Sequence, residues 1–184
     1  QVDNLGQAQA VAPAVADYRP TDPQVAFHLA RFIEQVRSIP ADAIVVADAK
    51  TYSGGPFDAV LVDAPCSATG TVRRHPELPY LKQASQIAEL VSLQRRMLRK
   101  AAELVRPGGQ LVYCTCSLEP EEGEAQMRWF LGRDDRYAVL PPSADLLPAS
   151  SVRPEGWVRT LPCMDYGSTR GMDGFFAVAL RRRD

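Results

Sequence analysis

The feature of this sequence that most constrains its fold is a long helical pattern between two short apolar segments. From Ala84 to Val105, apolar residues recur at spacings of three and four, which is typical of a helix that buries one face. The flanking segments, 57–62 and 110–114, are short and largely apolar, as buried strands are. Strands that alternate with helices predict an α/β fold with a mainly parallel sheet.

Further segments extend this alternation at both ends. Residues 44–47 form another apolar run that ends at Asp48, and residues 174–180 predict a last strand. A second helix is expected from Pro120 to about Leu131, because proline suits a first helical turn. Acidic residues in that turn would interact favourably with the helix dipole; they are Glu121, Glu122 and Glu124.

The bulk composition excludes some classes of protein. The net charge of -1 and the pI of about 6.2 are not those of a protein that holds nucleic acid by overall charge. Any nucleic-acid contact is therefore expected to come from a local basic patch or from a part of the protein outside this sequence. A loop with Arg73, Arg74 and His75 is either such a patch or a solvated loop. No apolar stretch approaches the roughly 18 residues of a membrane span. The first residues also lack the pattern of a signal peptide, so a cytoplasmic protein with no membrane partner is expected.

The four cysteines of the sequence are Cys66, Cys114, Cys116 and Cys163. The chain is neither short nor secretory in character, so a disulfide framework is not expected. A metal site such as zinc is not expected either, because the sequence has no Cys-x-x-Cys pair and its two histidines have no matching spacing. Cys114 and Cys163 are interpreted as small, buried apolar residues.

Three polar residues coincide with the ends of predicted strands. Asp48 and Asp63 close two strands, and Cys116 lies just beyond a third. Ligands of open α/β sheets bind at the carboxyl ends of the strands, so these side chains are expected to form one site. Cys116 also lies between a strand end and a helix start, where the helix dipole would lower the pKa of its thiol.

Two stretches around cysteines carry the most specific signal. Residues 63–71 place an acid at a strand end before a Pro-Cys pair, and residues 113–122 contain a Thr-Cys-Ser sequence. Both closely resemble motifs IV and VI of RNA 5-methylcytosine methyltransferases of the Sun/Fmu/NOL1/NOP2 (RsmB/NOP) family. Segments 106–109 and 171–176 resemble this family too, and the resemblance runs in unbroken order over about 42–182.

The resemblance implies the Rossmann-like sheet of class I methyltransferases, with S-adenosylmethionine as cofactor and RNA, of the 16S ribosomal type, as substrate. It assigns Cys116 as the nucleophile that attacks carbon 6 of cytosine, and Cys66 as a second cysteine implicated in product release. Asp63 corresponds to the acid at the cytosine edge and the cofactor site, and Asp48 to an acid near the adenine of the cofactor. DNA cytosine methyltransferases use a Pro-Cys nucleophile instead, so the two thiols could be exchanged. The Thr-Cys-Ser-Leu context favours Cys116.

Methylation at carbon 5 of cytosine explains why such residue types are needed. That carbon is a poor nucleophile until a thiolate adds to carbon 6, so the enzyme needs a thiol of low pKa. A polar group at the edge of the base stabilises the adduct. The base must also be unstacked and held in a pocket.

The sequence differs from this family in its first part. No Gly-rich loop precedes Asp48, so the first two strands of the family sheet and its cofactor loop are expected to be missing. Residues 17–40 instead resemble part of a TrbF-type conjugal-transfer protein. A third possible function, that of a secretion-system scaffold protein, rests on this stretch alone. We therefore expect an atypical linker and helix over 1–41 and a partial methyltransferase catalytic domain over 42–184. The alternative function is that of an inactive, truncated or fused remnant that acts at most as a binding module.

Overall fold

The computed structural model describes residues 52–142, 147, 149–165 and 170–184. Asp48, the strand expected at 44–47 and the whole of segment 1–41 lie outside these residues. The expectations for them therefore stay predictions.

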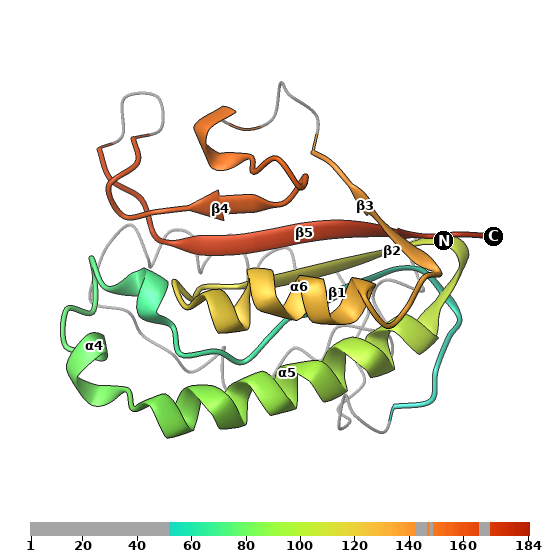
Figure 1. The fold of residues 1–184 in the computed structure, drawn as a ribbon, viewed down its shortest axis with the longest axis horizontal. Coiled ribbons are helices and arrows are strands. Elements are labelled where there is room, and N and C mark those ends of the chain that lie inside the picture. The colour runs from blue at the N-terminus through green and yellow to red at the C-terminus, as the bar shows by residue number, and fades with distance from the viewer. Residues whose placement is uncertain (1–51, 143–146, 148, 166–169) are drawn as a thin grey trace, which may run out of the picture.

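A five-stranded sheet forms the centre of the described region (Figure 1). Its main path runs through β1 (Phe57–Asp63), β2 (Val105–Thr115), β5 (Phe175–Arg182) and β3 (Tyr137–Leu140). β4 (Val158–Thr160) pairs with β5 as well, so that β3 and β4 cover successive stretches of the same strand.

The described strands form a mixed sheet where a mainly parallel one was expected. β1 and β2 are parallel, whereas β5 is antiparallel to β2, β3 and β4. Parallel neighbours need a crossover connection, usually a helix, and one such connection joins β1 to β2. The chain passes from β4 to β5 without a described helix, so β5 returns in the antiparallel direction and inserts between β2 and β3.

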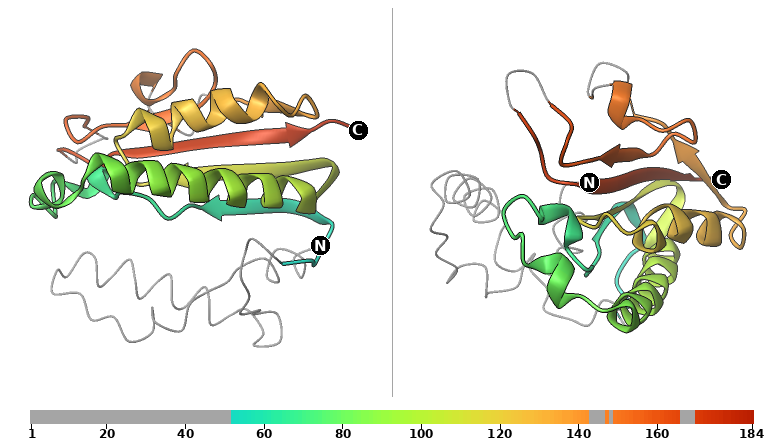
Figure 2. Two further views of the ribbon diagram at one scale, coloured as in Figure 1. Left: turned by 60° about the horizontal axis from the view of Figure 1, so that its bottom comes forward. Right: turned by 60° about the vertical axis from the view of Figure 1, so that its left-hand side comes forward.

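Two helices cover one face of this sheet, as Figures 1 and 2 show. α5 (Ala84–Leu104) confirms the longest helical pattern and packs against β1, β2 and α6 (Glu124–Leu131). A capping box between the side chains and backbones of Gln83 and Gln86 begins α5. No helix in the described ranges is long and apolar enough to cross a membrane.

The hydrophobic core lies between the sheet and these helices. Full burial of a large apolar side chain stabilises a fold by roughly 1.5–3 kcal/mol. The largest fully buried side chains here include Tyr113, Phe57, Phe130, Phe176, Leu98 and Leu111. The Tyr113 hydroxyl donates to the backbone oxygen of Glu122 at 2.9 Å, so the core also anchors the segment that leads to α6.

The helix predicted from Pro120 is interrupted. A 3-10 turn, η3 (Pro120–Glu122), comes first, and α6 starts only at Glu124. Gly123 lies between them, and a Cβ atom there would be 2.5 Å from Nη2 of Arg159 and 2.9 Å from the ring of Phe176. At Gly123 the backbone therefore lies directly against side chains of β4 and β5, and the helix is interrupted at this residue.

The short elements around the sheet ends complete the described fold. η2 (Thr69–Thr71) and α4 (Leu78–Leu81) lie between β1 and α5, and η4 (Ala149–Ser151) precedes β4. At the carboxyl end of the parallel pair, Asp63 lies opposite Cys114. The two loops that follow these strands therefore leave the sheet at the same edge.

Candidate active site

The two cysteine motifs meet where β1 and β2 end. The Sγ atoms of Cys66 and Cys116 lie 3.4 Å apart, although the residues are separated by 50 positions in the sequence. The loop backbones are joined as well, because Gly70 N–H donates to the Cys116 oxygen at 2.9 Å. Both residues are half-buried free cysteines, so neither is sealed in the core.

The contact between Cys66 and Cys116 shifts the pKa values of the two thiols in opposite directions. The hydrogen bond with Cys66 lowers the pKa of Cys116 below its ordinary value of 9.0, against burial and the carboxylates of Asp63 and Asp173, which raise it. The same hydrogen bond, followed by burial, raises the pKa of Cys66 well above its ordinary range. Cys116 is therefore the more acidic thiol and Cys66 the neutral donor. The main cause is the second cysteine and not the expected helix terminus, since only a three-residue 3-10 turn follows.

Asp63 and Cys114 lie at the same edge. Asp63 is exposed, and its Oδ1 atom lies 3.7 Å from the Sγ atom of Cys114. Burial, with the charge of Asp63, raises the pKa of Cys114 to about 12, so this thiol stays neutral. Cys114 is buried as expected, whereas the prediction that Cys163 is buried is wrong, because it lies in a turn after β4.

A buried carboxylate, missed from the sequence, lies beneath both cysteine loops. Glu122 has no exposed surface and accepts hydrogen bonds from the hydroxyls of Ser67 and Ser117 at 2.5 Å and 2.6 Å. Gln94 of α5 donates to the same carboxylate at 2.8 Å and to the backbone oxygen of Pro65 at 2.9 Å. The signals in the sequence were a glutamine inside an apolar stripe and a serine after each motif cysteine.

Arg159 of β4 holds the Cys116 loop from the other side. The residue is 3% exposed, and its Nε and Nη2 atoms donate to the two carboxylate oxygens of Glu124 at 2.9 Å and 2.6 Å. Its Nη1 atom donates to the backbone oxygen of Ser117 at 2.5 Å. Burial is the largest single influence on the pKa of Glu124 and raises it. The hydrogen bonds from Arg159, a backbone hydrogen bond and the charges of Arg159 and Arg128 together outweigh burial and lower this pKa below 4.5.

We expect Arg159→Met to lower the free energy of unfolding by about 3 kcal/mol at pH 7, because it leaves Glu124 without its buried partner. A carboxyl group with a depressed pKa stabilises the fold above its unfolded pKa, and this contribution is lost as the pH falls through the folded value. The difference between parent and variant should therefore shrink below pH 4.5. Urea unfolding at several pH values measures it. The exposed Arg99→Met should change stability by less than about 0.5 kcal/mol, and a difference independent of pH would contradict the assignment.

Asp173, in the segment before β5, is fixed close to the same site. Nε and Nη2 of Arg74 donate to Oδ2 of Asp173 at 3.0 Å and 2.5 Å, and the hydroxyl of Thr160 donates to its backbone oxygen at 2.8 Å. The next residue, Gly174, donates its N–H to the Gly70 oxygen at 2.7 Å, which joins this segment to the Cys66 loop. Arg74 thus pairs with a carboxylate of the protein, and its contact with RNA phosphates stays a prediction.

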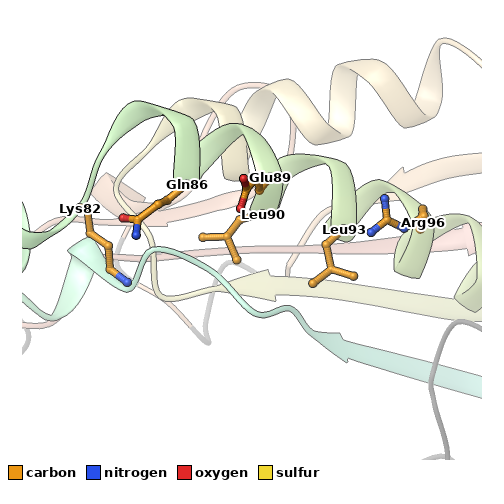
Figure 3. Close-up of a pocket in the computed structure, with 6 residues that line it drawn as sticks. All are labelled: Lys82, Gln86, Glu89, Leu90, Leu93 and Arg96. Carbon is orange, nitrogen blue, oxygen red and sulfur yellow. The ribbon is translucent and has the colours of Figure 1, made fainter.

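A separate pocket lies along the first half of α5. The side chains of Leu90 and Leu93, which help to line it, project from the helix (Figure 3). Its lining residues are Lys82, Gln86, Glu89, Leu90, Leu93 and Arg96. None of them is a candidate site residue, so this pocket is distinct from the cysteine site. Among the described residues, no group of three or more His, Cys, Asp or Glu side chains could hold a metal ion.

Comparison with known proteins assigns the chain to a family. Residues 24–181 match the family described as 16S rRNA methyltransferase RsmB/F. The chain belongs to this family. The RsmB/F match begins within the segment interpreted as an atypical linker and helix, whose structure lies outside the described residues.

Curated relatives of this RsmB/F-family chain are ribosomal RNA small subunit methyltransferases B. The protein of Xanthomonas campestris is 52% identical over 145 residues, which is 79% of the chain and 31% of the relative. The protein of Pasteurella multocida is 39% identical over 158 residues, 84% of the chain and 33% of the relative. The chain thus spans about a third of the length of these relatives.

Solved structures support the fold of the RsmB/F-family chain. The crystal structure of PH0851 is 32% identical, with a TM-score of 0.67, and covers 89% of this chain and 36% of that one. A methyltransferase homolog from Pyrococcus horikoshii is 25% identical, with a TM-score of 0.61, and covers 88% of this chain and 51% of that one. These similarities confirm the predicted Rossmann-like α/β fold of class I methyltransferases.

Proposed function

We propose that this chain is the catalytic part of an S-adenosylmethionine-dependent RNA cytosine-5 methyltransferase that acts on 16S-type ribosomal RNA in the cytoplasm. The observation that carries the proposal is the contact between Cys66 and Cys116, which makes Cys116 the more acidic thiol at the carboxyl edge of the sheet. The family match and the names of the curated relatives support ribosomal RNA as the substrate class.

Cys116 acts as the nucleophile in this proposal. Its thiolate forms a bond to carbon 6 of cytosine, and the displaced ring electrons make carbon 5 nucleophilic. Bound S-adenosylmethionine would supply the methyl group that carbon 5 takes up and would leave as S-adenosylhomocysteine. Loss of the carbon-5 proton to solvent then returns an electron pair to the ring and expels the Cys116 thiolate. Cys66, neutral and 3.4 Å away, donates a hydrogen bond to this leaving group and so assists product release.

The acidic side chains of the site fit both the base and the cofactor. Asp63 is exposed at the carboxyl end of β1, where its carboxylate can accept a hydrogen bond from the amino group of cytosine. The charges of Asp63 and Asp173 both reach Cys116, and such an acidic edge suits a cofactor that carries a positive sulfonium. Asp48, outside the described residues, is proposed to contact the adenine of the cofactor.

Transfer of labelled methyl groups from S-adenosylmethionine to small-subunit ribosomal RNA tests the proposal. We expect label in 5-methylcytidine, identified by mass spectrometry of the digested RNA. Cys163→Ala serves as the control, because it removes an exposed thiol from a turn outside the site, and it should methylate like the parent chain.

Titration with S-adenosylhomocysteine separates the proposal from the alternative of an inactive remnant. Binding in the micromolar range, followed by calorimetry, would argue against a remnant. A folded chain that neither binds this product nor transfers methyl groups would contradict the proposed activity and leave a binding module as the better description.

A further inference from the structure

Glu122 is a fully buried carboxylate whose hydrogen-bond partners come from three separate segments. Its Oε2 atom accepts from the hydroxyls of Ser67 at 2.5 Å and Ser117 at 2.6 Å. Its Oε1 atom accepts from Nε2 of Gln94 at 2.8 Å and from the backbone N–H of Ser67 at 3.1 Å. Every one of these partners is a donor, which is the arrangement that satisfies an ionised carboxylate.

The two serines on Glu122 are the residues that directly follow the two motif cysteines. Ser67 follows Cys66, and Ser117 follows Cys116. Their hydroxyl oxygens lie 3.0 Å apart and share the Oε2 atom of the carboxylate. One carboxylate oxygen therefore holds two Cys-Ser pairs, from loops 50 positions apart, against each other.

Stability alone is a weak reason for such a group at this place. Taking a carboxylate out of water is costly, and within the described part of the chain no lysine or arginine donates to Glu122. Apolar side chains of similar volume often stabilise a buried site equally well. What they cannot do is fix the relative position of two hydroxyls, which directional hydrogen bonds to a charged acceptor do.

We propose that Glu122 is a positioning residue, which clamps the Cys66–Ser67 and Cys116–Ser117 pairs so that one thiol can hydrogen-bond to the other. This inference rests on the proposed function, in which that hydrogen bond activates the nucleophile. Glu122 touches neither substrate nor cofactor in this scheme and acts only through the two cysteines.

The clamp and the bare charge of Glu122 predict different outcomes for the pKa of Cys116. If the clamp matters, its loss weakens the hydrogen bond with Cys66, the largest cause of the lowered pKa of Cys116, and this pKa rises. If only the negative charge matters, its removal lowers the pKa of Cys66, which the charge of Glu122 raises, and the pKa of Cys116 does not rise. The sign of the change therefore decides.

The other groups around these thiols remain in place in the test. The carboxylates that face Cys116 are Asp63 at the end of β1 and Asp173 before β5. Cys66 faces it from the β1 loop, and Tyr113 of β2 contacts the backbone of Glu122. Because none of them is replaced, a shift in the titration of Cys116 reports the change at position 122.

The experiment compares Glu122→Gln with Glu121→Gln in the 184-residue chain. Alkylation of Cys116 by iodoacetamide is followed against pH by peptide mass mapping, because the thiolate is the reactive form. We expect Glu122→Gln to raise the midpoint for Cys116 by about one pH unit and to slow alkylation near neutral pH roughly tenfold. Glu121 is exposed, so the same chemical change there should leave the profile unaltered.

A midpoint that stays or falls in folded Glu122→Gln overturns the proposal, and so does an equal rise in Glu121→Gln. Should Glu122→Gln fail to fold, as seen by circular dichroism, Ser67→Ala and Ser117→Ala decide, because each removes one hydroxyl donor and no charge. Both should raise the midpoint for Cys116, and unchanged profiles in both overturn the clamp. Alkylation needs neither RNA nor cofactor, so its outcome stays distinct from a failure of methyl transfer.

Discussion

Cys116→Ala is expected to reduce methyl transfer to RNA by about a thousandfold or more, because it removes the proposed nucleophile. Cys66→Ala is expected to behave differently. Its loss raises the pKa of Cys116 and so slows the attack, but it also removes the hydrogen bond that assists departure of the thiolate, so each adduct that forms persists. The variant should therefore accumulate a covalent complex with RNA, visible as a band of lower mobility on denaturing gels after incubation with substrate and cofactor.

The results for Cys116→Ala and Cys66→Ala together also show which of the two cysteines is the nucleophile. A Pro-Cys nucleophile, as in DNA cytosine methyltransferases, would make Cys66→Ala the silent variant and Cys116→Ala the one that traps RNA. The lowered pKa of Cys116 and the raised pKa of Cys66 argue for the opposite order. Cys163→Ala is the matched control, since it removes an exposed thiol and should change neither the rate nor the mobility. Equal rates in all three variants would contradict covalent catalysis by either motif cysteine.

The parts of the fold with a regular apolar pattern were predictable from the sequence. β1 and α5 lie within one residue of their predicted bounds, and β2 contains the predicted run 110–114. It was also predictable that Asp63 and Cys116 lie near each other, because the carboxyl ends of parallel strands lie at one edge of a sheet. The 3.4 Å contact with Cys66 follows from that edge, since both loops leave adjacent strands.

The polar framework beneath the loops could not be predicted in this way. An acid in the turn after Pro120 has the same local pattern whether it is exposed or buried, and the burial of Glu122 depends on Ser67, which is 55 positions away. β4 has only three residues, too few to show a period, so the contact of Arg159 with Glu124 left no local trace either. Such long-range contacts decide how the motif cysteines are held, while local patterns decide only which strands they follow.

Gly70→Ala is expected to lower the free energy of unfolding by about 3 kcal/mol or more and to reduce methyl transfer with it. A Cβ atom at this position would lie 2.0 Å from the backbone oxygen of Gly174 and 2.7 Å from that of Cys116. These neighbours are backbone atoms and cannot rotate away as a side chain can. Relief of the clash must therefore move the Cys116 loop or the segment before β5, and either movement breaks a hydrogen bond made by Gly70.

Gly132→Ala provides the matched comparison for this effect. Gly132 ends α6 with a φ of -74°, and the nearest backbone atom to an added Cβ is the Arg128 oxygen at 3.0 Å, so the change should stay below about 1 kcal/mol in urea unfolding. Gly70→Ala should also slow the alkylation of Cys116 near neutral pH, because displacement of the Cys116 loop lengthens the contact between the thiols of Cys116 and Cys66. A Gly70→Ala chain as stable and as reactive as Gly132→Ala would contradict the close packing of the two loops. The activated thiol is thus expected to depend on this backbone contact as directly as on its neighbouring side chains.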